Sequence, residues 1–171
     1  MNSKGFKLLF TCFVFFTSSC EEKMCGCTIM DLSTIILVTD DQNQNLLDPS
    51  TPGYFKPEDI RIYYVKDGQR KDVYQANLDT PRNFRIEQFT SAKELAMVLY
   101  PDEGTRDGEI TTTIIQWNDV AADTLDCEVH HWDSSVAITR IWNKDELVYD
   151  KDNGLTQWDD TQVSRLVRLT K

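Results

Sequence analysis

The sequence contains little positive charge and no hydrophobic run that is long enough to cross a membrane. The apolar stretch at residues 8–16 is interrupted by Thr11 and Cys12, whereas a transmembrane helix needs about 20 apolar residues. Only 18 Lys and Arg stand against 28 Asp and Glu, which gives a formal net charge of −10. This acidity argues against nucleic acid as a partner and against direct adsorption on anionic lipid.

Motifs for catalysis are also missing. The chain has no Gly-x-Ser-x-Gly turn, the motif that presents the nucleophile in many hydrolases. His131, Asp133 and Ser134 could supply a Ser-His-Asp site, but such triads are defined by geometry, and residues close together in a strand diverge. We therefore predict no catalytic residues, no cofactor and no enzymatic activity.

The first twenty residues have the three parts of a secretory signal. Lys4 and Lys7 precede the apolar run, and the small residues Ser18 and Ser19 come directly before Cys20. One interpretation is an ordinary cleaved signal peptide with a cysteine at the junction by chance. The other interpretation is that Cys20 is itself a functional residue of the signal.

Ser18, Ser19 and Cys20 resemble the bacterial lipobox, in which the cysteine receives diacylglycerol. The resemblance implies that Cys20 is the mature N-terminus and carries lipid, including palmitate. Several acyl chains hold a protein firmly on a membrane, since each buried CH₂ contributes about 0.8 kcal/mol. We expect a signal peptide at 1–19, a lipid-anchored tether at 20–27, a domain at 28–171, and an outer-membrane lipoprotein of the cell envelope.

The rest of the chain alternates polar and apolar residues with a period of two, and it contains no internal repeat. Turn signals such as Asp67-Gly68 separate the apolar runs. The pattern predicts an all-β domain, a single antiparallel β-sandwich. The main strands are expected near 33–39, 60–65, 83–89, 110–117, 124–132, 135–142 and 163–169, with further short strands at 72–75, 95–100 and 147–149.

The stretch 36–49, a strand followed by an Asn-rich turn and Leu46-Leu47-Asp48-Pro49, is similar to the opening of many uncharacterised small lipoproteins of Bacteroidota. Asp123-Thr124-Leu125 and the hairpin at 138–149 are also similar to that group. The resemblance implies a transthyretin-like or immunoglobulin-like sandwich, and it implies no activity.

Three cysteines besides Cys20 belong to the mature chain. An exported protein meets an oxidising compartment, so Cys127 could form a disulfide with Cys25 or Cys27. The alternation in 124–132 places Cys127 on an apolar face with Leu125 and Val129.

Metal sites are weighed and not predicted. Cys25, Cys27, Cys127, His130 and His131 offer zinc ligands, but the Cys-x-Cys spacing is tight and His130 points away from Cys127 in a strand. The start of an EF-hand loop is similar to 41–45, yet its later positions fail, and a turn explains the segment without an ion.

The function that we expect is non-enzymatic: a lipid-tethered envelope protein that binds a protein partner or supports a surface complex. The alternative is a glycan- or ligand-binding accessory module, because aromatic faces can stack on sugar rings. Large aromatic residues also dominate ordinary cores. The candidates for glycan stacking are Trp117, Trp132, Trp142 and Trp158.

Overall fold

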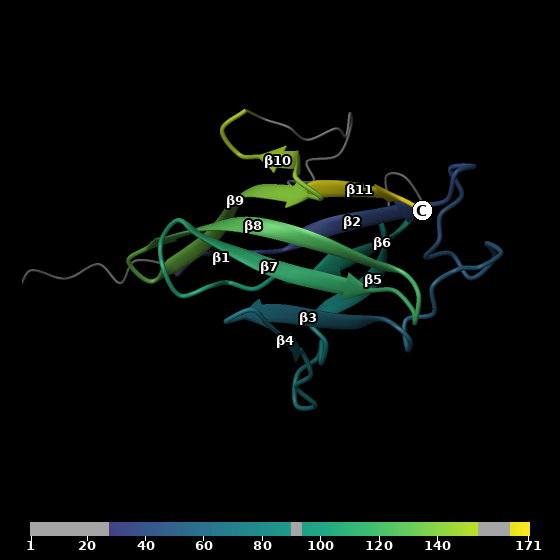
Figure 1. Ribbon diagram of the computed structural model, residues 1–171, viewed down its shortest axis with the longest axis horizontal. Helices are drawn as coiled ribbons and strands as arrows, with labels where there is room; N and C mark the ends of the chain where they lie inside the picture. The colour runs from purple at the N-terminus through teal and green to yellow at the C-terminus, as the bar shows by residue number, and fades with distance from the viewer. Residues whose placement is uncertain (1–27, 90–93, 154–164) are drawn as a thin grey trace, which may run out of the picture.

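The computed structural model describes residues 28–89, 94–153 and 165–171, and over these ranges the chain forms eleven strands (Figure 1). The described residues include no helix that is long and apolar enough to cross a membrane. The all-β prediction is confirmed, and the observed strands overlap the seven main predicted ones.

Seven strands form the larger sheet. Their order is β1, β9, β8, β7, β3, β4, and β10 pairs with the second half of β9. Asp67 and Gly68 both adopt positive φ and join β3 to β4, which confirms the predicted hairpin turn. The strands are β1 (Met30–Asp31), β3 (Arg61–Lys66), β4 (Gln69–Asp72), β7 (Glu109–Gln116), β8 (Ala122–Trp132), β9 (Ser135–Asn143) and β10 (Glu146–Asp150).

Four strands form the smaller sheet, in the order β11, β2, β6, β5. Their bounds are β2 (Thr34–Thr39), β5 (Phe84–Phe89), β6 (Glu94–Leu99) and β11 (Leu166–Thr170). β2 lies between two neighbours, and its residues from Thr34 to Val38 are all buried, as the continuous apolar run predicted.

The sandwich is not purely antiparallel, so this part of the fold prediction is wrong. β1 runs parallel to β9, and β11 runs parallel to β2. Hairpin turns impose antiparallel neighbours, and the prediction rested on them. The two exceptions are the first and last strands, which pair with strands far away in the sequence, where no turn signal sets the direction.

One apolar core fills the space between the sheets. Alternate residues of each strand point into it and the intervening residues point outward. The larger sheet contributes Ile62, Ile115, Leu125 and Ile138, and the smaller sheet contributes Ile36, Met97 and Val167, all completely buried. On the smaller sheet the opposite face is also largely buried, in a second cluster made of Ile35, Leu37, Ala96, Val98 and Leu166. The outer face of the larger sheet is therefore the more accessible of the two.

The domain has two distinct ends. At one end the chain enters β1 beside the turn between β8 and β9, where Thr28 Oγ1 donates to Ser134 Oγ at 3.2 Å. At the other end lie the loop between β7 and β8 and the C-terminal residue, marked C in Figure 1. The eleven residues of β8 run between the two ends and span about 33 Å.

Candidate functional site

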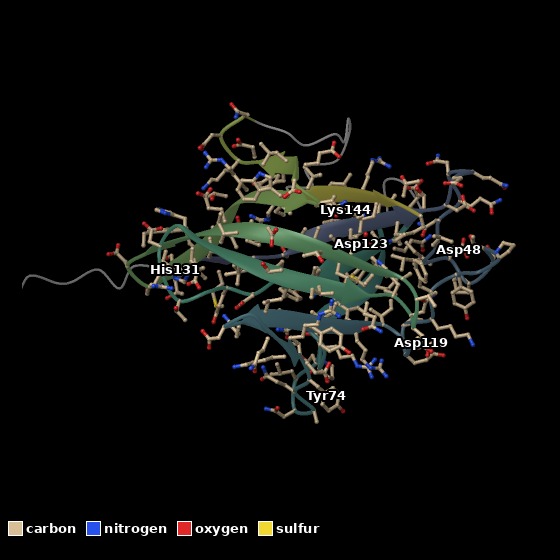
Figure 2. All side chains as sticks on the ribbon, in the orientation of Figure 1. Asp48, Tyr74, Asp119, Asp123, His131 and Lys144 are labelled. Atoms are coloured by element: carbon tan, nitrogen blue, oxygen red, sulfur yellow. The ribbon has the colours of Figure 1, made fainter. Side chains whose placement is uncertain are left out.

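A polar groove of about 340 Å³ opens on the outer face of the larger sheet, at the end far from Thr28. Figure 2 labels one of its residues, Asp119, at the opposite end of the molecule from His131. We call it the distal groove, and its lining residues are Asp59, Arg61, Tyr63, Gln116, Asn118 and Asp119.

The strand register explains why these side chains gather there. Arg61 and Tyr63 lie on either side of the buried Ile62, so both point away from the core. Arg61 is paired with Gln116 of β7, which brings that side chain onto the same face. Two neighbouring strands thus supply three of the lining residues by simple alternation.

Trp117 anchors the loop that forms the far wall. Its ring is completely buried, stacks on Phe55 with 5.2 Å between ring centroids, and donates from Nε1 to Asp123 Oδ2 at 2.6 Å. Because Trp117 points inward, its neighbours Gln116 and Asn118 point outward and line the groove.

The loop itself is held by its own side chain. Asn118 Oδ1 accepts hydrogen bonds from the backbone N–H of Val120 at 3.0 Å and of Ala121 at 2.8 Å. This leaves the amide Nδ2 of Asn118, with its two donors, available to a ligand. Asp119 follows and is exposed.

The guanidinium of Arg61 is held in place by backbone carbonyl groups. Its Nη1 donates to the carbonyl oxygens of Glu58 at 2.5 Å and Ile60 at 3.0 Å, and Arg82 donates to the same two oxygens. A guanidinium has five N–H donors, so the remaining donors of Arg61 are available for hydrogen bonds to a ligand.

The other polar side chains of the groove have unused hydrogen-bonding capacity. The side chains of Asp59, Tyr63, Gln116 and Asp119 form no hydrogen bond or ion pair with one another or with any other residue that the structure describes. Several donors and acceptors that converge without internal partners are what a binding site for a polar molecule requires.

A larger groove of about 560 Å³ lies on the smaller sheet and has a different chemistry. Its lining is mostly apolar, and its two charged residues pair with each other: Arg85 donates to Glu87 and also to the hydroxyl of Tyr100. Because its polar groups satisfy one another, we place the candidate site at the distal groove. We call this second depression the Met30 groove, after the exposed residue at its edge.

The structure places the predicted tryptophans apart. Trp117 is in the core, so its ring cannot reach a ligand. Trp142 pairs with Asp126 on the outer face of the larger sheet, while Trp132, six residues further along β8 than Asp126, stacks on His130. Six residues of a strand span about 20 Å, so these two rings do not form one stacking site. Trp158 lies outside the described residues.

Cys127 is completely buried on the face that it shares with Leu125 and Val129, as the alternation predicted. Burial, with a smaller effect of the charges of Asp126 and Asp102, raises the pKa of its thiol to about 12. Cys20, Cys25 and Cys27 lie outside the described residues, so lipidation and the disulfide stay predictions.

The histidines serve local contacts. His130 Nδ1 lies 2.6 Å from Asp107 Oδ1, and His131 Nε2 lies 2.8 Å from the carbonyl oxygen of Glu103. Over 28–89, 94–153 and 165–171, no group of three or more His, Cys, Asp or Glu side chains could hold a metal ion.

No protein-family model matches this chain, and neither a curated protein nor a solved structure shows significant similarity to it. The six residues of the distal groove were all missed from the sequence. The signal that could have found four of them is the pair of alternations Arg61-Ile62-Tyr63 and Gln116-Trp117-Asn118, each with polar or amphipathic residues around a buried one.

Proposed function

We propose that this chain is a lipid-anchored, non-enzymatic binding module of the cell envelope, built on a transthyretin-like or immunoglobulin-like sandwich. In this proposal Cys20 carries the lipid of an outer-membrane lipoprotein, and the distal groove holds a polar ligand. The observation that carries the proposal is the convergence of unpaired polar side chains in that groove. It favours the ligand-binding alternative over the protein partner that the sequence suggested first.

The position of the groove supports this function. The eight residues 20–27 reach at most about 28 Å when fully extended, and they lead into Thr28 beside the turn between β8 and β9. The groove lies at the other end of the domain, about 33 Å further away along β8. When the domain stands on its tethered end, the groove faces away from the bilayer.

A protein partner is the second candidate, and one observation favours it. The Met30 groove is mostly apolar, and Ile29 and Met30 beside it are 51% and 66% exposed. Exposed apolar surface of this kind is common at contacts between proteins.

The anchoring is tested with the Cys20→Ala variant. We expect the wild-type chain in the membrane fraction, with no peptide that spans Ser19 and Cys20 in its mass spectrum, because the signal peptide has been removed. The variant should leave the membrane fraction. A variant that stays fully membrane-bound would contradict the proposed anchor.

The binding site is tested with a thermal-shift screen of the full chain in detergent, using sugars, nucleosides, amino acids and short peptides. We expect at least one compound to raise the melting temperature of the wild type and not that of an Asp59→Ala, Asp119→Ala variant. If the same compounds stabilise both proteins, the distal groove is not the site.

A further inference from the structure

We propose that the ligand of the distal groove is a neutral saccharide, with the ring of Tyr63 as its stacking platform. This inference rests on the proposed function, because it names the class of ligand for the same groove. It also moves the sugar-binding role from the tryptophans that the sequence suggested to a tyrosine on the neighbouring strand β3.

Tyr63 has the position that stacking requires. It is partly exposed on the outer face of the larger sheet and lines the groove, between Ile114 of β7 and Asp72 of β4 in the strand register. Ile114 is buried beside it on the same outer face. One face of a pyranose ring presents C–H groups, and an aromatic ring with its negative π face is a suitable surface for them.

The polar groups around Tyr63 match the hydroxyls of a sugar. A hydroxyl is both a donor and an acceptor, so it needs partners of both kinds. Asp59 and Asp119 supply acceptors, the free amide hydrogens of Asn118 and the remaining donors of Arg61 supply donors, and the amide of Gln116 can do either.

Charge and size narrow the class of ligand. Two carboxylates face one guanidinium in a chain of net charge −10, so an anionic ligand such as a phosphate or a uronic acid would be repelled. The volume of about 340 Å³ is at the lower end of ligand pockets. A neutral sugar of one or two rings, or the end of a longer glycan, therefore fits the groove best.

The test is binding of the full chain, purified in detergent, to an array of neutral glucans, mannans, xylans and galactans, with polygalacturonate and heparin as acidic probes. We expect binding to at least one neutral probe and none to the acidic ones. Tyr63→Ala should weaken binding at least about 10-fold, whereas Tyr63→Phe, which keeps the ring, should stay within about 3-fold of the wild type.

Two further variants provide a control outside the groove and a second test within it. Tyr74→Ala removes an exposed tyrosine outside the groove, labelled in Figure 2, and should bind like the wild type. Gln116→Ala changes a half-exposed side chain at the groove and should weaken binding about 5-fold, the loss of one hydrogen bond. If Tyr63→Ala does not fold, Gln116→Ala carries the test.

The results separate this inference from the proposed function. Retention of neutral-glycan binding in Tyr63→Ala and Gln116→Ala would overturn the inference, as would binding to the acidic probes alone. A groove-dependent ligand in the thermal-shift screen that is not a sugar, with no glycan bound on the array, would overturn the saccharide assignment and leave the proposed function standing. If neither experiment finds a ligand, both fall.

Discussion

Replacing Trp117 with phenylalanine tests how the loop beside the groove is held. The indole Nε1 of Trp117 donates to Asp123 Oδ2 at 2.6 Å, and the side chain of Asp123 is only 2% exposed. The same carboxylate oxygen accepts from Lys171 Nζ, whose ammonium also lies over the indole ring. Trp117→Phe keeps an aromatic ring against Phe55 and removes the N–H.

Two effects add up in this variant. A hydrogen bond to a charged acceptor contributes about 1.5–3 kcal/mol. The smaller ring leaves part of the site empty, and with about 24 cal/mol per Å³ of cavity this costs about 1 kcal/mol more. We therefore expect the free energy of unfolding to fall by about 2.5–4 kcal/mol. The melting temperature should fall by about 5–15 °C in a domain of this size.

The measurement is urea unfolding followed by far-ultraviolet circular dichroism, because the substitution itself changes tryptophan fluorescence. Trp142→Phe is the matched control: Trp142 is half-buried on the outer face, and its indole forms no hydrogen bond with the other described residues. The control should change the free energy of unfolding by less than about 1 kcal/mol.

A double-mutant cycle with Asp123→Ala isolates the hydrogen bond. Asp123→Ala leaves the buried indole N–H without an acceptor, and Trp117→Phe removes that N–H. The two changes should therefore be non-additive, with a coupling of about 1.5–3 kcal/mol. Additive effects, or a Trp117→Phe variant as stable as the Trp142→Phe control, would refute the role given to this pair.

Two further predictions concern ionisation. Hydrogen bonds from Arg165 lower the pKa of Asp31 below its usual 3.8, against the opposing effect of burial. The stabilisation by the ionised carboxylate is complete above the pKa of the unfolded chain and is lost as pH falls through the folded pKa. Below about pH 4, the free energy of unfolding of Asp31→Asn should therefore fall less steeply with decreasing pH than that of the wild type. The buried thiol of Cys127, with its pKa of about 12, should resist iodoacetamide at pH 8 in the folded, reduced chain and react after unfolding in urea. Equal labelling rates in the two states, read by mass spectrometry, would contradict its burial.

The positions of the strands could be predicted from the sequence because each depends on local alternation. Leu125, Cys127 and Val129 form an apolar face in the sequence, and all three are completely buried. The directions of β1 and β11 could not be predicted in this way. β1 has only two residues, and both strands pair with partners that no hairpin connects to them.

The candidate site was harder to predict because it depends on which strands are neighbours. Arg61 and Gln116 lie side by side only because β3 pairs with β7, and no turn connects these two strands. The burial of Trp117 was difficult to predict for a different reason. Its size and polar N–H suit a binding surface and a core equally well, and only the acceptor on Asp123 allows its burial.

The way in which the chain enters the fold has a mechanical consequence if Cys20 is fixed in a membrane. Tension on the tether would first load β1, whose two residues pair with β9 and whose Asp31 contacts Arg165, together with the hydrogen bonds that join Thr28 and Ile29 to residues 134–136. Once β1 detaches, the force would act along β2, which lies between β11 and β6 and can slide only if both neighbours release it together. β1 would therefore detach at a lower force than β2, and the groove at the far end would keep its shape while β1 detaches.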